Sequence, residues 1–149
     1  MIKKGIILAG GSGTRLSPLT KSVNKQLLPI HDKPMIFYPL SVMMLANIKK
    51  ILIIVNPGQI NIFRNLLGDG SRYGIEIIYK VQDKPRGLPD AFILGKTFID
   101  SDNVALILGD NFFYGQSLTK KLEKSSVHKS GATIFLKEVS FPENYGVAK

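Results

Sequence analysis

Short apolar runs alternate along the chain with segments in which apolar residues recur every three or four positions. The runs are nearly continuous and rich in β-branched residues, which is typical of strands buried on both faces. We predict strands at residues 6–9, 51–55, 75–79, 104–108 and 132–136. Alternation of strand and helix indicates the α/β class, as a three-layer α/β/α sandwich with a mostly parallel sheet.

The predicted helices lie between these runs. One extends over residues 34–47, with Pro34 in its first turn. Another covers residues 60–67, where Gly68 supplies a stop, and a third begins near Leu118. Because ligands of such sheets bind at the carboxyl ends of the strands, the residues that follow Ala9 and Leu108 are the first candidates for a site.

Composition narrows the class of protein. The 149 residues are 44% hydrophobic and 21% charged, as expected for one globular domain. There is no cysteine, which excludes disulfides and thiolate metal sites and fits a cytoplasmic location. No stretch approaches the roughly 20 apolar residues of a membrane span, so we expect no membrane contact. The net charge of +9 favours anionic partners, although a solvated basic surface explains it equally well.

A glycine-rich loop follows the first predicted strand. Gly10, Gly11 and Gly13 allow a tight turn whose N–H groups can point at phosphate oxygens, and Arg15 adds a planar fork suited to phosphate. The loop lacks the third glycine of a dinucleotide fingerprint and the Gly-Lys-Ser/Thr of a Walker A loop. Lys25 offers a second positive charge. The alternatives are a plain strand-to-helix turn and a solvated lysine.

Two further strand ends carry polar candidates. Asp110 follows the fourth strand in Gly-Asp-Asn, where its carboxylate can hold Mg²⁺ or simply form an Asx turn. Gln82 follows the third strand, and its amide can donate and accept, so it can read the edge of a pyrimidine or serve as a polar loop residue.

Taken together, three segments resemble the start of the sugar nucleotidyltransferase family. They are Gly-Gly-Ser-Gly-Thr-Arg-Leu at 10–16, Lys-Gln-Leu-Leu-Pro at 25–29 and Asp-Lys-Pro-Met-Ile at 32–36. The resemblance extends from Lys4 to Val147. It implies the Rossmann-like fold of the nucleotide-diphospho-sugar transferases and the transfer of a thymidylyl group from dTTP to glucose-1-phosphate, giving dTDP-glucose and pyrophosphate.

The resemblance also implies roles for individual residues. Arg15, Lys25 and Asp110 would be catalytic, and Asp110 would hold the Mg²⁺ cofactor. Asn111 and Gly146 would face the sugar. The nucleotide would be bound by Leu8, Ala9, Gly10, Gly11, Ser12, Gly13, Thr14, Arg15, Gln26, Gln82, Pro85 and Gly87.

The sequence departs from the family at one point and leaves other functions open. Family members usually have Gly-Leu-Ala, a polar residue and Ala, whereas this chain has Pro89 in the third position of residues 87–91, which removes a backbone donor. A UTP-dependent sugar-1-phosphate uridylyltransferase and a non-catalytic nucleotide-binding regulator are the alternatives. A nucleic-acid-binding module is disfavoured, because no helix-turn-helix signature, aromatic stacking motif or basic stripe is present.

The resemblance stops at Tyr-Gly-Val, residues 145–147. We therefore expect residues 1–149 to form the N-terminal, nucleotide-binding part of a nucleotidyltransferase domain, without the C-terminal sugar-binding part and with little turnover. The strand predicted at 132–136 would then lack neighbours. Its unpaired edge and uncovered apolar surface predict a homo-oligomer.

Overall fold

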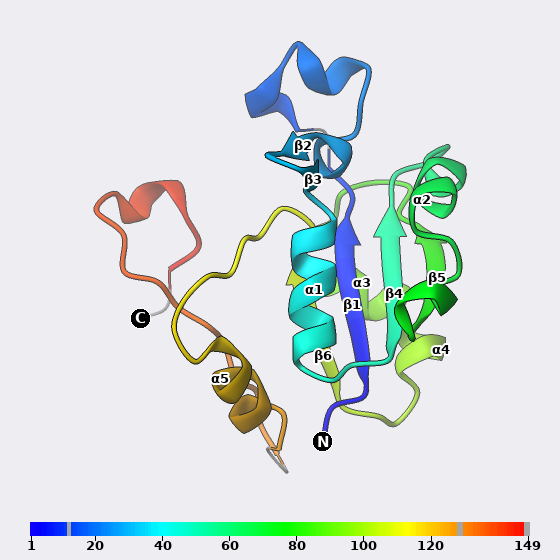
Figure 1. Ribbon diagram of the computed structural model, residues 1–149. Coiled ribbons are helices and arrows are strands. Elements are labelled where there is room, and N and C mark those ends of the chain that lie inside the picture. Colours follow the sequence, from blue (N-terminus) through cyan, green and yellow to red (C-terminus); the bar gives the residue numbers. More distant parts are fainter. Residues whose placement is uncertain (12, 128–129, 148–149) are drawn as a thin grey trace.

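The computed structural model describes residues 1–11, 13–127 and 130–147. A parallel sheet with the strand order β5-β4-β1-β6 forms its centre (Figure 1). The four strands are β1 (Lys4–Ala9), β4 (Lys50–Val55), β5 (Glu76–Val81) and β6 (Val104–Leu108). Ile6 pairs with Leu52 on one side and with Leu106 on the other. This sheet confirms the first four predicted strands.

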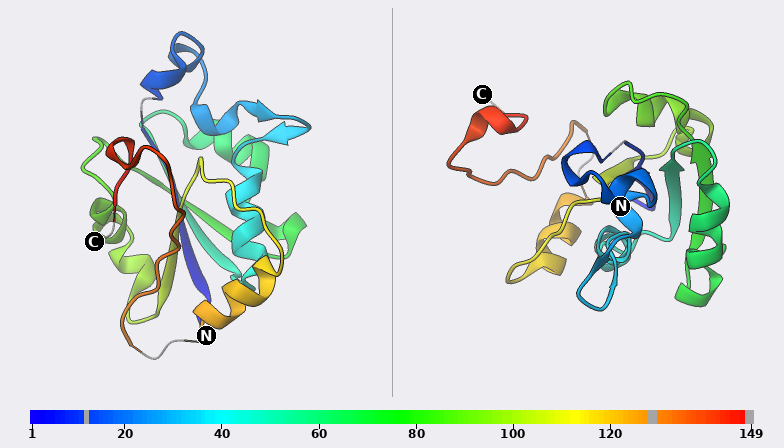
Figure 2. Two further views of the ribbon diagram at one scale, coloured as in Figure 1. Left: turned by 90° about the vertical axis from the view of Figure 1, so that its left-hand side faces the viewer. Right: turned by 90° about the horizontal axis from the view of Figure 1, so that it is seen from above.

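Helices cover both faces of the sheet, which confirms the three-layer architecture (Figures 1 and 2). Ile7 and Ile53 are fully buried in the core on one face, which holds α1 (Phe37–Leu45), α2 (Ile60–Leu67) and α5 (Leu118–Ser125). Ile6 and Leu52, one position earlier in each strand, belong to a second cluster on the opposite face, under α3 (Pro89–Leu94) and α4 (Lys96–Ile99). Adjacent strand residues therefore fill different cores.

The three predicted helices form, but α1 is shorter than the predicted residues 34–47, and α3 and α4 were not predicted. Gly68 ends α2 with φ at 67°, as predicted, and α5 begins at Leu118. The prediction that Pro34 lies in the first turn of a helix is wrong. Pro34 lies in β3 (Lys33–Pro34), which pairs antiparallel with β2 (Pro29–Ile30). That pairing keeps the chain extended, and the helix begins only at Phe37.

Short 3-10 turns lie in the connections between these elements. Three of them follow β1 and lie beyond the carboxyl ends of the strands (Figure 1): η1 (Thr14–Leu16), η2 (Leu19–Lys21) and η3 (Lys25–Leu27). The others are η4 (Ser71–Tyr73) and η5 (Pro142–Asn144). Among the helices of the described ranges, none is long and apolar enough to cross a membrane.

The strand predicted at residues 132–136 does not form. This segment is extended and pairs with no strand of the described part of the chain (Figure 2). Ile134 and Leu136 are 67% and 70% exposed, and Phe135 contacts Phe113 with ring centroids 5.9 Å apart. A strand needs a hydrogen-bonded neighbour, and β-branched sequence alone does not supply one. The apolar surface that we expected to be uncovered is therefore present.

Candidate functional site

The order of the strands places two loops side by side. From β1 the chain builds outward through β4 and β5, then returns to add β6 on the other side of β1. The strand order thus reverses between β1 and β6, and ligands of open α/β sheets bind at such a point. The glycine-rich loop follows β1, and Gly109 and Asp110 follow β6. A hydrogen bond from the Gly109 N–H to the Leu8 carbonyl, at 2.9 Å, holds the two strand ends together.

A cleft of about 230 Å³ opens at this position. It is lined by Gly10, Gly11, Gly13, Thr14, Arg15, Leu16, Lys25, Gln26 and Asp110. The structure thus brings together the glycine-rich loop, both predicted phosphate-binding cations and the predicted metal ligand.

Lys25 and Asp110 form an ion pair across the cleft. Lys25 Nζ lies 2.8 Å from Asp110 Oδ2, and the two side chains are 29% and 31% exposed. Partial exposure keeps the desolvation cost of each charge low and leaves both within reach of a ligand. An entering anion would compete for Lys25, while a cation would compete for Asp110. The pair therefore presents both signs of charge to one bound molecule.

The glycines of the loop adopt conformations that other residues avoid. Gly11 has a φ of 104° and Gly13 a φ of 59°. A Cβ on Gly13 would also lie 2.8 Å from the Thr20 methyl group, which is closer than real Cβ contacts. The Thr20 hydroxyl donates to the Gly13 carbonyl at 2.8 Å. Thr20 thus fixes one side of the turn, and the opposite side stays open to a ligand.

Asn56 supports the same loop and was not predicted. The Gly11 N–H donates to Asn56 Oδ1 at 3.0 Å, and Asn56 Nδ2 donates to the Gly11 carbonyl at 2.9 Å. Asn56 is the first residue after β4, the strand next to β1. The same rule that drew attention to the ends of β1 and β6 could have found it.

Asn24 and Gln26 fill the space behind the loop. Buried Asn24 donates from Nδ2 to the Ala9 carbonyl at 3.3 Å and accepts the Gln26 N–H at 2.8 Å, which caps η3. Gln26 Nε2 donates to the Gly10 carbonyl at 3.5 Å. Gln26 Oε1 is buried and has no partner among the described residues. An unmade hydrogen bond of this kind costs about 1–3 kcal/mol, which a donor on a ligand can recover.

The donor set around Asp110 fits one kind of metal. Within the described part of the chain, no three acidic or histidine side chains gather as a metal site. Mg²⁺ commonly takes one or two carboxylates and completes its shell with water and the phosphates of a substrate. Asp110 could therefore hold Mg²⁺ together with a phosphate ligand, but not by itself.

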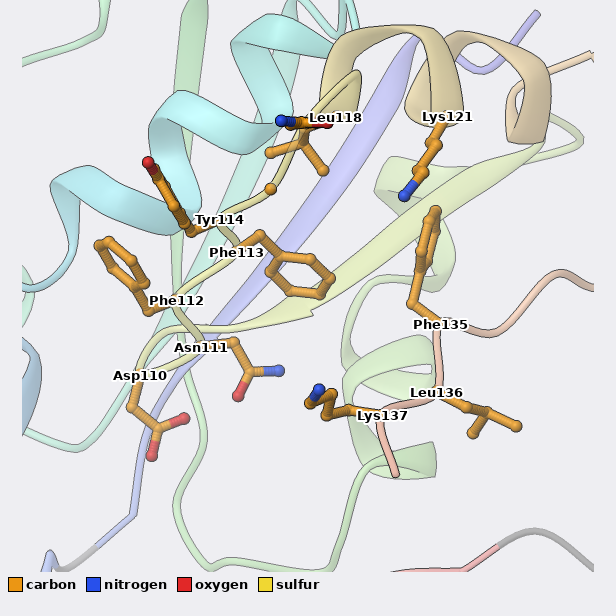
Figure 3. Close-up of a pocket in the computed structure, with 12 residues that line it drawn as sticks. Asp110, Asn111, Phe112, Phe113, Tyr114, Leu118, Lys121, Phe135, Leu136 and Lys137 are labelled. Carbon is orange, nitrogen blue, oxygen red and sulfur yellow. The ribbon is translucent and has the colours of Figure 1, made fainter. Parts of the chain in front are cut away.

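A larger cavity of about 540 Å³ adjoins the cleft (Figure 3). Asp110 and Asn111 line it on the side of the cleft, α5 contributes Leu118 and Lys121, and the extended segment contributes residues 135–137. Figure 3 shows that aromatic side chains from the loop after Asp110 project around this space. Asn111 thus lines a space that is larger than the cleft and adjoins it.

The sequence model of the nucleotidyl transferase family matches residues 4–149. The chain belongs to this family. The glucose-1-phosphate thymidylyltransferase of Neisseria meningitidis is 58% identical over 98% of this chain, which corresponds to 51% of that relative. The chain spans about half the length of the curated relatives it matches.

Solved structures agree on the fold of this nucleotidyl transferase. A crystal structure from Bacillus anthracis, assigned as a glucose-1-phosphate thymidylyltransferase, superimposes with a TM-score of 0.90 and 39% identity, covering 97% of this chain and 58% of that one. A UTP-bound UDP-glucose pyrophosphorylase from Acinetobacter baumannii superimposes with a TM-score of 0.72 over 85% of this chain and 52% of that one, and at 23% identity this likeness shows the fold alone.

Several residues predicted to bind ligands lie outside the lining of the cleft. Gln82 is buried beside the loop, where its Oε1 would lie 3.1 Å from a Cβ on Gly10. Pro85 and Gly87 are exposed, and Gly87 has a φ of 88°. Gly146 is exposed, with no described atom within 4 Å of a Cβ built on it. Ser12 lies outside the described residues. The structure thus brings together the residues predicted to bind the phosphates, but not the residues predicted to bind the sugar.

Proposed function

We propose that this nucleotidyl transferase chain binds dTTP in the cleft between β1 and β6. We further propose that the protein transfers the thymidylyl group to glucose-1-phosphate and releases pyrophosphate. The observation that carries the proposal is the lining of one cleft by the glycine-rich loop, Arg15, Lys25 and Asp110. The 58% identity to a glucose-1-phosphate thymidylyltransferase supports the choice of substrates.

The attacking group needs little help from the protein. A sugar phosphate has a second pKa of about 6, so it is already anionic at neutral pH and requires no general base. Its phosphate oxygen attacks the α-phosphorus of dTTP, and the bond from that phosphorus to the pyrophosphate breaks. Two anions must approach each other, so positioning and electrostatic stabilisation supply most of the catalysis.

The residues of the cleft suit these tasks. The N–H groups of the loop bind phosphate oxygens, and Arg15 stabilises the triphosphate and the departing pyrophosphate. Lys25 neutralises charge around the attacked phosphorus. Asp110 would hold Mg²⁺, which would screen the charge of the nucleotide phosphates. The ion pair at 2.8 Å supports this division of roles, because it places a cation for a phosphate and an anion for a metal ion side by side at the cleft.

The base and the sugar occupy the two sides of this phosphate site. On the β5 side, Gln82 reads the base with Gly87 and Pro85, while Leu8 and Ala9 contact the nucleoside through their backbone. On the β6 side, Asn111 meets the hexose, and Gly146, which follows η5, supplies a further backbone contact to it. We also propose a cytoplasmic location, and association of two or more copies through the exposed apolar residues at 134–136.

Two measurements test this function. Calorimetry of the chain with dTTP, with and without Mg²⁺, should show binding that Mg²⁺ strengthens. Pyrophosphate release should depend on glucose-1-phosphate and should be faster with dTTP than with UTP, dCTP or ATP. Tight binding of dTTP with no glucose-1-phosphate-dependent release in the complete protein would instead identify a nucleotide-binding regulator.

A further inference from the structure

A buried pair of side chains lies behind the glycine-rich loop, on the β5 side. Gln82 follows directly after β5, and Asp90 lies in the first turn of α3. Gln82 Nε2 donates to Asp90 Oδ2 at 2.7 Å, and the two residues are only 5% and 4% exposed. The second oxygen of Asp90 faces Arg86 Nη1 at 3.5 Å. Asp90 is thus held from two sides, by the amide of Gln82 and the guanidinium of Arg86.

This pair determines which way the Gln82 amide points. A carboxylate only accepts hydrogen bonds, so the amide nitrogen of Gln82 must face Asp90. The amide oxygen then faces away from Asp90 and toward the loop, where it would lie 3.1 Å from a Cβ on Gly10. A half-turn of the amide would set an oxygen against a buried carboxylate oxygen and leave both without a donor, which is costly in a buried site.

We propose that Asp90 is a positioning residue that selects the nucleotide base through Gln82. With Oε1 turned toward the loop, the base site presents an acceptor and therefore prefers a base edge that carries a donor. The imide N–H of thymine or uracil meets this requirement, whereas cytosine and adenine present an acceptor nitrogen at the corresponding position. This inference rests on the proposed function, in which Gln82 reads the base.

Substitution of Asp90 by Asn tests the idea with almost no change in shape. An amide at position 90 can donate as well as accept, so the Gln82 amide is free to turn and present its nitrogen to cytosine. We expect the ratio of dTTP to dCTP affinity, measured by calorimetry with Mg²⁺, to fall on the order of tenfold in Asp90→Asn. Asp100→Asn is the matched control, because Asp100 is exposed at the end of α4 and should leave the ratio unchanged.

A second variant exchanges the two groups. Gln82→Glu combined with Asp90→Asn keeps one amide and one carboxylate in the same volume, and places an acceptor-only oxygen at the base site. It should restore the preference for dTTP over dCTP that Asp90→Asn loses, which a merely structural role of Asp90 would not predict. Circular dichroism melting checks folding, and if Asp90→Asn does not fold, the ratio in the exchanged pair decides.

The outcomes separate this inference from the proposed function. If the wild-type chain prefers dTTP and Asp90→Asn keeps the same ratio, the positioning role is overturned while the function stands. A wild-type chain that binds both nucleotides equally overturns the inference as well. If the wild-type chain binds neither nucleotide, the proposed site itself is wrong, and this inference falls with it.

Discussion

Residues 1–108 and residues 110–147 contain similar apolar runs, which are buried in the first region and largely exposed in the second. In the first region Ile53 lies in the middle of the sheet and is fully buried between α1 and α2. In the second, Tyr114 is 93% exposed, and Ile134 and Leu136 lie largely in solvent. Apolar sequence leads to burial only where a neighbouring strand or helix is present to cover it. Asp110, which lines both the cleft and the larger cavity, marks the boundary between the two regions.

The packed region and the exposed region would bind different substrates of the proposed reaction. The loop that would hold the triphosphate is fixed by Asn24, Asn56 and Thr20, all within the packed region. The residues that would meet the sugar belong to the exposed region. Stability should therefore depend on the first region and on α5, whose Leu122 is buried in the same core, whereas residues 130–147 should tolerate change.

The largest effect is expected at the boundary itself. Asp110→Asn should abolish Mg²⁺-dependent turnover in the complete protein and the strengthening of dTTP binding by Mg²⁺ in this chain, because the shape is kept and the charge is lost. The free energy of unfolding should change by less than about 1 kcal/mol, since the ion pair with Lys25 is partly exposed. Asp102→Asn is the control, as it also loses a lysine partner, at 2.7 Å, far from the cleft. Unchanged dependence on Mg²⁺ in Asp110→Asn would remove this residue from the metal site.

Lys25→Ala should lower kcat far more than nucleotide affinity. A charge that acts mainly as the transition state develops shows this pattern. Steady-state kinetics of the complete protein provide the measurement. Lys21→Ala, an exposed neighbour in η2, serves as the comparison and should behave like the wild type. A raised KM with kcat intact would reduce Lys25 to a residue of ground-state binding.

A pair of identical substitutions compares the two regions directly. Ile53→Ala should lower the free energy of unfolding by about 2–5 kcal/mol, because it leaves a cavity in the core. Ile134→Ala should change it by no more than about 0.5 kcal/mol, and should weaken any self-association seen by sedimentation. Urea titrations of both variants give the comparison. Comparable losses would mean that the extended segment is packed in solution.

Asn56→Ala should affect the loop without affecting the core. Loss of both hydrogen bonds to Gly11 should weaken dTTP binding by roughly 1 kcal/mol, since the loop must then be ordered by the ligand. Asn65→Ala, on the exposed side of α2, is the matched control. Equal affinity in the two variants would show that the loop needs no support from β4.

The smallest effect concerns alkaline pH. Burial raises the pKa of Tyr79 to about 12 from its usual 10.0, and its hydroxyl donates to the Gly68 carbonyl at 2.6 Å. The folded chain favours the neutral phenol, so this stabilisation is complete below pH 10 and is lost as the pH rises toward 12. The difference in unfolding free energy between the wild type and Tyr79→Phe should narrow across that window. A constant difference would contradict the assignment.

Much of the packed region could be predicted from sequence. Continuous runs of apolar, β-branched residues located the strands that form the sheet, and Gly68 marked the end of α2. The rule about strand ends then pointed to the loop after Ala9 and to Asp110, which the structure places in one cleft. These predictions succeeded because strands buried on both faces have a distinctive pattern, and because parallel strands bring their ends to one edge.

Tertiary partners explain what the sequence did not reveal. Pro34 fits the first turn of a helix locally, but pairing with Pro29 draws it into β3. Residues 132–136 have the pattern of a strand and lack a hydrogen-bonded neighbour within the described chain. Asn56 contacts Gly11, which is far away in sequence, and only its position directly after β4 points to it. The role proposed for Asp90 depends on the orientation of the Gln82 amide, which leaves no local signal.

We propose above all that the carboxyl ends of β1 and β6 form a nucleoside triphosphate site. Nitrogen–proton correlation spectra of the chain, recorded during a titration with dTTP and Mg²⁺, test it residue by residue. We predict the largest shifts at the amides of Gly10, Gly11, Gly13 and Arg15 and at Lys25, with residues 134–141 unchanged. Shifts concentrated at residues 112–116 and 135–137, or no shifts at saturating nucleotide, would contradict it.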